Sequence, residues 1–513
     1  MELQLIREAL RLEQPLGTGR ATAMVTGEVT LPGGLREETR VLAVHAMASA
    51  DSAEAATGRV NVRGRVAFCV LYTQGDPTQV KSVEATADFL HPCEMRGAQP
   101  RAEVQAFVQA GRAEARATGG RMSLRAEVDI GVSAASLSPV EAVTALEGAD
   151  DVQVLARPQT IRRTVALGSG EKLLREELPL PEGLQITQTL GADAYAVVEA
   201  ITGGVGRVGL SGQVLLEAAH ASRLPGRPVT VTRHAIPFTQ SVELSGEEGE
   251  TLDGSAVVKD VAVALQEDES GQQTLRAEVL LGLEGRAEAE ETLSVLQDAY
   301  TTDGDEVRLT GETILCRTGG KAVSAAESAR VTLRLPPSAP PVRQVLAAFA
   351  RPQETQRDTH EGRTTLSGTM DATLVYMTDG SDAPASVRLS EPFRVTFAQE
   401  TAAEDFIALA ATDTEAVPVT SDRVELRCIL RMQARTQQAA PLRLVTGGET
   451  IPANPVTEDV VLYFTQPGEG LWDIARRYRT PVSAVEALNP GLRGEPQPGQ
   501  GVVVWRRCGA GCL

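Results

Sequence analysis

The sequence is poor in aromatic residues and in positive charge, and each shortage excludes a class of protein. Aromatic residues make up only 3% of the 513 residues, so any hydrophobic core must rely on Val, Leu, Ile and Ala. Lys and Arg number 49 against 68 Asp and Glu, which gives a formal net charge of −19. Such an acidic chain lacks the basic surface that attracts nucleic acid or an anionic membrane. We therefore expect no nucleic acid partner. No apolar run approaches the ~20 residues of a membrane-spanning helix, so we also expect no membrane insertion.

The six cysteines are too scattered to indicate a secreted disulfide framework. Only Cys508 and Cys512 are close together, and this pair is compatible with a metal site, a bridge or a flexible tail. The N-terminal segment has neither the basic nor the apolar region of a signal peptide. We therefore expect a cytoplasmic protein with reduced thiols.

Histidines are also few, and no catalytic pattern surrounds them. None of the five has the spacing of a zinc protease motif, and the sequence contains no phosphate-binding loop and no GxSxG segment. Residues 204–209 fit the pattern GxGxxG but lead into a predicted strand, so no helix N-terminus would face a pyrophosphate. We expect no enzyme activity, no cofactor and no metal.

What the sequence does contain is a repeat of about 150 residues. A strand that runs into a proline, a Gly-x5-Gly segment that continues as a strand, and a Leu-Arg strand recur three times in the same order. The Gly-x5-Gly segments are residues 58–64, 206–212 and 362–368. Glycine inside a strand indicates a bulge or a close backbone approach. We predict that Gly64, Gly212 and Gly368 occupy equivalent positions.

The repeat predicts a mainly β fold. Apolar residues alternate with period two around the glycines, and Gly, Pro and Asp separate the short strands, as in antiparallel sandwiches or barrels. We expect three repeated antiparallel β-rich modules at 1–155, 156–305 and 306–445, then a linker at 446–457. His220 replaces Tyr72 and Tyr376 of the sister repeats, and we interpret it as a structural substitute.

A different pattern covers residues 458–507 and precedes a short tail at 508–513. A strand at 460–464 is followed by apolar residues with the spacing of one helix face, a second short helix, and a last strand at 502–505. This strand, helix, helix, strand order predicts a small βααβ domain.

The C-terminal segment resembles a LysM domain. The matching residues are Tyr463, Gln466-Pro467-Gly468-Glu469, Leu471-Trp472, Ile474-Ala475, Tyr478, Leu488-Asn489-Pro490 and Pro498-Gly499-Gln500. The family usually has Ser or Thr where this chain has Gly470. A LysM-like end after three β modules resembles the SipL-like proteins of endospore-forming Firmicutes, whose repeated domain is called DUF3794 or SPOCS.

The resemblance implies a non-enzymatic scaffold in spore coat assembly, located in the mother-cell cytoplasm at the forespore surface and partnered by a SpoIVA-like coat protein. It also implies a binding groove between two loops of the LysM-like segment. The first loop consists of Gly468, Glu469, Gly470, Leu471 and Trp472, and the second of Asn489, Pro490, Gly491 and Leu492.

The occupant of this groove stays open between two classes of ligand. We expect it to bind the coat protein, because Gly470 removes a hydroxyl that would bind a sugar and because Trp favours protein interfaces. The alternative is the N-acetylglucosamine backbone of peptidoglycan or a chitin-type glycan. Trp472 either anchors a partner or packs the small core. A wall hydrolase with a LysM targeting domain is a third class, which the missing catalytic residues and export signal disfavour.

Overall fold

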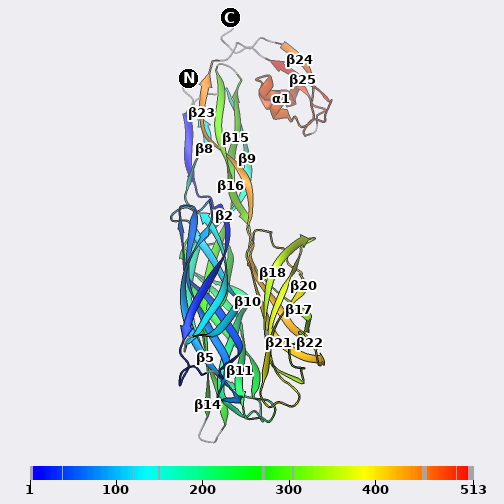
Figure 1. Ribbon diagram of the computed structural model, residues 1–513. Helices are drawn as coiled ribbons and strands as arrows, with labels where there is room; N and C mark the ends of the chain where they lie inside the picture. The colour runs from blue at the N-terminus through cyan, green and yellow to red at the C-terminus, as the bar shows by residue number, and fades with distance from the viewer. Residues whose placement is uncertain are drawn as a thin grey trace.

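The computed structural model describes residues 4–36, 38–118, 121–147, 151–267, 272–302, 305–452, 459–492 and 494–506. Cys508 and Cys512 lie outside the described residues, as do residues 453–457 of the predicted linker. The described chain is dominated by antiparallel strands, which form three similar sandwiches, a stalk and a small C-terminal domain (Figure 1). The mainly β fold with three repeated modules is thus confirmed.

The first module is a sandwich of two three-stranded antiparallel sheets. One sheet has the order β2-β7-β6 and the other β3-β4-β5. The strands are β2 (Gln14–Val29), β3 (Arg40–Ala56), β4 (Arg59–Gln74), β5 (Asp76–Glu94), β6 (Glu103–Thr118) and β7 (Arg121–Ser136). Alternate residues of β7, including Leu124 and Val128, point into a core of Val, Ala and Leu side chains shared by both sheets.

The second and third modules repeat this arrangement. The second pairs the sheet β13-β9-β15-β14, which has the short extra strand β13, with β10-β11-β12, and the third pairs β17-β22-β21 with β18-β19-β20. The second module comprises β9 (Val152–Pro179), β10 (Ile186–Gly204), β11 (Arg207–Ser222), β12 (Val229–Glu243), β13 (Ser245–Gly246), β14 (Thr251–Glu267) and β15 (Gln273–Thr301). The third comprises β17 (Ala322–Arg334), β18 (Gln344–His360), β19 (Arg363–Met377), β20 (Ala385–Phe397), β21 (Ile407–Thr420) and β22 (Arg423–Arg435).

The repeated glycines lie where a β-bulge in the neighbouring strand of the same sheet leaves no room for a side chain. A Cβ atom on Gly64 would lie 2.2 Å from the carbonyl oxygen of Ser49, and Cβ atoms on Gly212 and Gly368 would each lie 1.9 Å from a carbonyl oxygen of the neighbouring strand. Each glycine also pairs in register with a phenylalanine, namely Phe89, Phe238 and Phe393. The three glycines therefore occupy equivalent positions, as the repeat predicts.

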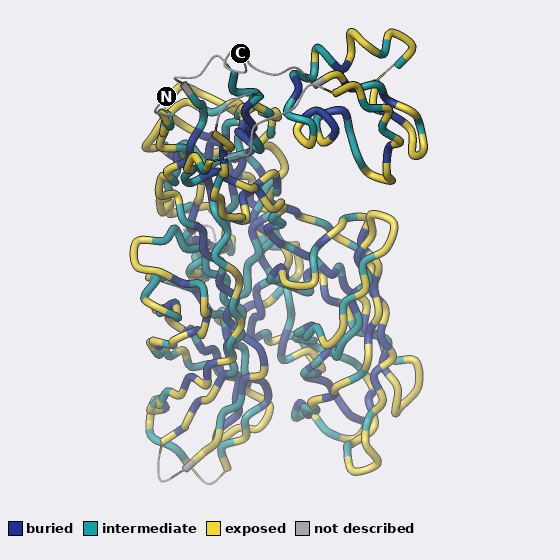
Figure 2. Tube along the Cα trace, turned by 90° about the horizontal axis from the view of Figure 1, so that it is seen from above, coloured by how far each residue is buried: buried dark blue, intermediate teal, exposed yellow. Residues whose placement is uncertain are grey.

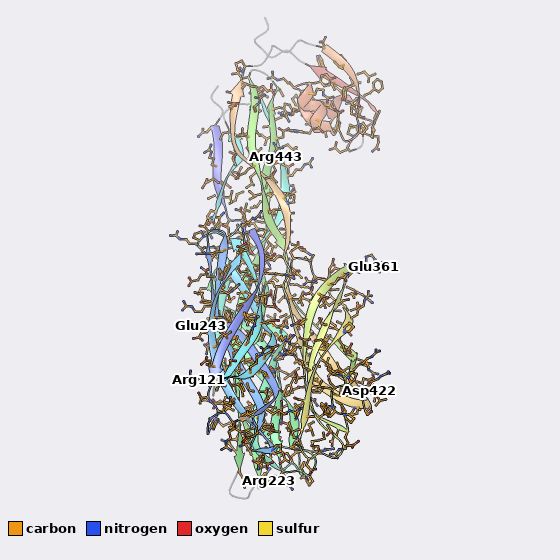
Figure 3. The ribbon with its side chains drawn as sticks, viewed as in Figure 1. Arg121, Arg223, Glu243, Glu361, Asp422 and Arg443 are labelled. Carbon is orange, nitrogen blue, oxygen red and sulfur yellow. The ribbon has the colours of Figure 1, made fainter. Side chains whose placement is uncertain are left out.

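A two-stranded ribbon extends from each sandwich, and the three ribbons pack together as a stalk (Figure 1). The first and third ribbons are β1 (Gln4–Leu10) with β8 (Val140–Glu147), and β16 (Glu306–Gly319) with β23 (Gln438–Ile451). The second is formed by the long strands β9 and β15, which continue without a break from their sandwich. Figure 3 labels Arg443 on β23 within the stalk, and Glu361 and Asp422 at turns of the third module.

The predicted linker before the C-terminal domain is partly wrong, because its first residues belong to a strand of the stalk. The polar residues before the C-terminal domain suggested a linker at 446–457, but β23 continues to Ile451 and pairs with β16. The strand forms because β16 supplies its backbone partners and because Leu442, Leu444 and Val445 are buried among the other ribbons. The expected module boundaries stay predictions, and the first falls inside β9.

Two buried clusters join the three modules. An apolar cluster contains Leu42, Leu190 and Ala347 from the first, second and third modules. Leu42, Leu190 and Leu346 occupy matching β-bulges, which turn the extra residue of each strand toward this cluster. The burial pattern in Figure 2 places exposed residues mainly along turns and outer strand faces.

The second cluster is ionic and lies where the stalk leaves the sandwiches. The Arg317 guanidinium is 3.2 Å from Glu13 Oε2 and 2.5 Å from Glu288 Oε1. Arg286 lies 3.9 Å from Glu13 and 4.0 Å from Glu288. These four side chains are at most 6% exposed, so the cluster links all three modules away from water.

The C-terminal domain has the predicted βααβ order. Its elements are β24 (Asp459–Phe464), α1 (Leu471–Arg477), α2 (Val482–Leu488) and β25 (Gly501–Arg506). Both helices pack on one face of the two-stranded sheet through a core that includes Ile474, Val485 and Val504. Neither helix in the described part of the chain has the length and apolar character needed to span a bilayer.

Candidate functional site

The first loop of the predicted groove is held by Glu469. Its Oε2 accepts a hydrogen bond of 2.6 Å from the Tyr463 hydroxyl and one of 2.9 Å from the Gln466 backbone N–H. Arg477 forms an ion pair of 2.5 Å with the same carboxylate. The Tyr463 hydrogen bond, with the Gln466 N–H and Arg477, lowers the pKa of Glu469. This side chain therefore shapes the loop around Gly468, whose φ of +85° suits glycine.

The residue after Glu469 begins helix α1 without a side-chain cap. Gly470 is the N-cap, and the backbone N–H of Leu471, the first helical residue, donates to Glu495 Oε2 at 2.9 Å. A Cβ atom on Gly470 would lie 2.7 Å from that same oxygen. The Gly470 N–H donates to Asp473 Oδ2 at 2.9 Å. Glu495, which the sequence did not single out, thus satisfies the first free N–H of α1 and lies against the position that a side chain on residue 470 would occupy.

The second loop is fastened to the sheet by Asn489. Its Nδ2 donates to the carbonyl oxygens of Val485 and Val503, both at 2.7 Å, and its Oδ1 accepts the Val503 N–H at 2.8 Å. Leu492 packs against the domain core, while Pro490 and Gly491 are exposed. Asn489 therefore holds α2 against β25, and Pro490 and Gly491 form the accessible part of the loop.

Trp472 contacts the second module. Its Nε1–H donates to Asp298 Oδ2 at 2.8 Å, and its ring meets the Tyr300 ring edge-on at 4.9 Å between centroids. Asp298 and Tyr300 lie at the stalk end of β15, far away in the sequence. Of the two sequence-based alternatives, Trp472 therefore packs against the core of the small domain, and that core also includes Tyr300 of the second module.

The same strand end makes further contacts with the C-terminal domain. Tyr300 is 3% exposed and belongs to the hydrophobic core of this domain, and its hydroxyl donates to the Thr480 carbonyl oxygen at 2.7 Å. Arg476 forms an ion pair of 2.7 Å with Asp298. Arg479 donates to the Thr301 carbonyl oxygen at 3.0 Å. No local pattern in the sequence could reveal these long-range partners.

The outer face of the small sheet carries apolar side chains that sequence analysis missed. Val460, Leu462 and Phe464 are 58–71% exposed, and Trp505, paired with Val460, is 38% exposed. Directly paired residues of antiparallel strands share a face. The available signal in the sequence was the unbroken apolar run at 460–464, which places apolar side chains on both faces of a strand. Apolar surface of this kind is typical of interaction sites.

A second candidate is a cleft of about 320 Å³ between the three modules. Asp193 lies there 3.5 Å from His45 and 3.4 Å from Arg351. Burial favours the neutral form of Asp193, but His45 and Arg351 outweigh this effect and hold its pKa well below the usual range. Arg233 and Glu217 form another pair of 2.9 Å at this cleft. The Asp193 ion pairs therefore join all three modules, whereas Arg233 and Glu217 pair within the second module and contact the Thr414 backbone of the third.

The remaining sequence-based candidates have structural roles. Within the GxGxxG segment, Gly206 forms the turn between β10 and β11 with a φ of +64°. Cys69 donates to the Leu190 carbonyl oxygen, and burial raises its pKa to about 12, so the thiol stays protonated. Among the described residues, no three His, Cys, Asp or Glu side chains are grouped to hold a metal.

Comparisons with known proteins identify two domains. The SipL, SPOCS domain family model matches residues 39–117, which lie in the first sandwich, and the LysM domain family model matches residues 463–505. No curated protein and no solved structure matches significantly. Both domains on which the SipL-like resemblance rests are therefore present in this chain.

Proposed function

We propose that this protein is a non-enzymatic scaffold in endospore coat assembly that binds a SpoIVA-like coat protein through its LysM domain. The combination of a SipL SPOCS domain with a LysM domain supports a role related to sporulation. In this proposal the protein acts in the mother-cell cytoplasm at the forespore surface. Three sandwiches on one stalk offer several faces, and linked binding faces raise the effective concentration of their partners.

The observation that carries the protein-binding proposal is the use of the groove's polar groups by the chain itself. The N–H groups of Gly470 and Leu471 and the Nε1–H of Trp472 all donate to carboxylates of this chain. The Asn489 side chain is likewise engaged. Sugar binding needs a few well-placed polar groups, whereas a protein partner can use the exposed loop at Pro490 and Gly491 and the apolar sheet face.

Glycan binding is the second candidate, because the LysM match itself supports it. The ligand class would be the N-acetylglucosamine backbone of peptidoglycan or chitin. Backbone carbonyl groups of the two loops and the exposed residues Pro490 and Gly491 would then contact the sugar.

Calorimetry with the full chain separates the two candidates. We expect binding of the coat protein and no binding of chitin pentaose at the same concentration. Gly491→Arg adds bulk to the accessible loop, where a Cβ meets no atom within 4 Å, and should weaken coat-protein binding about tenfold. Gly170→Arg is the matched control, because that glycine is equally open but lies in β9. Micromolar binding of chitin pentaose with none of the coat protein would reject the proposal.

A further inference from the structure

The end of β15 fills a slot on the LysM domain. Tyr300 enters the domain core, meets the Trp472 ring at 4.9 Å and donates its hydroxyl to the Thr480 carbonyl oxygen. Burial, with the nearby Asp298 carboxylate, raises the pKa of Tyr300 above its usual value, so the hydroxyl keeps the proton that it donates. The slot thus recognises both the ring and the hydroxyl.

A carboxylate completes this recognition. Asp298 accepts from Trp472 Nε1–H at 2.8 Å and pairs with Arg476 at 2.7 Å. Residues two apart in a strand lie on the same face, so Asp298 and Tyr300 reach the slot together. Trp472 and Arg476 thus donate to one carboxylate, and the Thr480 carbonyl oxygen accepts from a hydroxyl. Such an arrangement is typical of a surface that recognises a peptide rather than of an apolar contact.

We propose that this slot is a protein-docking site, and that in this structure the end of β15 from the same chain occupies the place of the partner. The partner that fits it is an extended segment with Asp or Glu two residues before Tyr. Phe in place of Tyr would leave the Thr480 carbonyl oxygen without its hydrogen bond, which disfavours Phe. The inference rests on the proposed function in one respect, that the LysM domain binds a protein.

The polar half of the contact is the part that a partner can replace. The Asp298 and Arg476 side chains are 21% and 47% exposed, so water reaches their ion pair, whereas Tyr300 is almost fully buried. A competing segment therefore meets Asp298 first. Because β15 belongs to the same chain, its end is present at the slot at an effective concentration on the order of mM, and a free peptide must compete with it.

Tryptophan fluorescence reports the slot directly. The chain has two tryptophans, so a Trp505→Phe background leaves only Trp472. In this full-length background Asp298→Ala removes the carboxylate without opening a cavity at Tyr300. We expect red-shifted Trp472 emission and faster acrylamide quenching. Glu486→Ala is the matched control, because Glu486 is an exposed carboxylate on α2 of the same domain, and it should leave the emission unchanged.

The probe is a synthetic peptide with the sequence of residues 293–302, titrated into both proteins. We expect the Asp298→Ala chain to bind the peptide about tenfold more tightly than the parent. In this variant the end of β15 has lost the hydrogen bond between Trp472 and the charged Asp298, so it competes less well with the peptide. Peptides with Asn for Asp298 or Ala for Tyr300 should bind much more weakly. Equal affinities for parent and variant, or equal affinities for all three peptides, would overturn the inference.

The assay also separates this inference from the proposed function. It contains neither coat protein nor glycan, so failure of the peptide to bind rejects the docking slot and leaves the coat-protein proposal standing. If the peptide binds as expected while the coat protein binds no form of the chain, the slot stands and the proposed function fails.

Discussion

His220 shows how one residue of a repeat can be exchanged while the fold is kept. It stands where the sister modules have Tyr72 and Tyr376, it is fully buried, and its Nε2 lies 2.8 Å from the Thr232 hydroxyl. Burial, with the nearby His234, lowers the pKa of His220 to about 4. The imidazole is therefore neutral in the folded protein at neutral pH, which agrees with a structural role.

This buried histidine should make stability depend on pH. Its pKa is about 4 in the folded protein and ~6.5 in an unfolded chain, so the unfolded state binds the proton first as the pH falls. The contribution of His220 to the free energy of unfolding should decrease by up to about 1.4 kcal/mol per pH unit between pH 6.5 and 4. Denaturant unfolding of the parent and of His220→Tyr across this range measures the difference.

His360→Tyr is the control for this measurement, because the His360 side chain is 82% exposed. The parent and the His360 variant should show the same pH dependence, while His220→Tyr should be flatter. Parallel curves for the parent and His220→Tyr would contradict the neutral, buried histidine.

Gly470 and Glu495 should behave as a coupled pair. Glu495→Ala removes the acceptor of the Leu471 N–H, so the LysM domain should lose about 1 kcal/mol of stability, the usual effect of removing a helix cap. Adding Gly470→Ser to that variant supplies a hydroxyl that can accept from the N–H of Trp472 or Asp473, and this new N-cap should offset the loss. Trp472 fluorescence during thermal unfolding reports each variant. Additive effects of the two substitutions would show that Glu495 does not cap α1.

At the scale of elements, the repeated glycines allow the neighbouring strand of the same sheet to come close at its β-bulge. Gly64→Ala, Gly212→Ala and Gly368→Ala would each place a methyl group within 1.9–2.2 Å of a carbonyl oxygen. A strand must shift to accept it, which should lower the free energy of unfolding by about 2 kcal/mol. Gly170→Ala, where a Cβ meets nothing within 4 Å, should change stability little. Chemical denaturation of the four variants tests this, and equal stabilities would exclude the close approach.

These elements also show how far sequence reasoning reaches. The glycines, the alternating strands and the βααβ order were predictable because each depends on residues close together in the chain. Residues 446–451, the last part of β23, were expected to belong to a linker because their strand conformation depends on pairing with β16 rather than on their own residues. Within the candidate site, the two loops were predicted, but Asp298, Tyr300 and Glu495 were not. The first two belong to a distant strand, and a capping carboxylate has no pattern of its own.

The whole molecule is built as three sandwiches that share one stalk, and the modules depend on each other. The apolar cluster around Leu42, Leu190 and Ala347 joins the sandwiches, and Tyr300 joins the stalk to the LysM domain. The LysM core is therefore completed by a residue of the second module. An isolated fragment of this domain would lack that residue, which is why binding experiments use the full chain.

The ionic cluster at the base of the stalk should be essential for this assembly. Arg317 pairs with Glu13 of the first module and Glu288 of the second, and its Nε also donates to the Gly319 carbonyl oxygen at 3.2 Å. Burial alone would lower the pKa of Arg317, but Glu13 and Glu288 outweigh that effect and raise it, so the guanidinium is charged. Removing it leaves two buried carboxylates that share the more distant Arg286.

Arg317→Met should therefore lower the free energy of unfolding by about 3–5 kcal/mol, the usual loss when one member of a buried ion pair is removed. Denaturant unfolding at pH 8 measures it, with Arg121→Ala as control, because the Arg121–Glu28 pair is 69% and 64% exposed and should contribute below about 1 kcal/mol.

Arg317→Met combined with Glu288→Leu should recover part of the loss, since Glu13 then has Arg286 to itself. A loss no larger than that of Arg121→Ala would mean that the modules are joined by their apolar cluster alone.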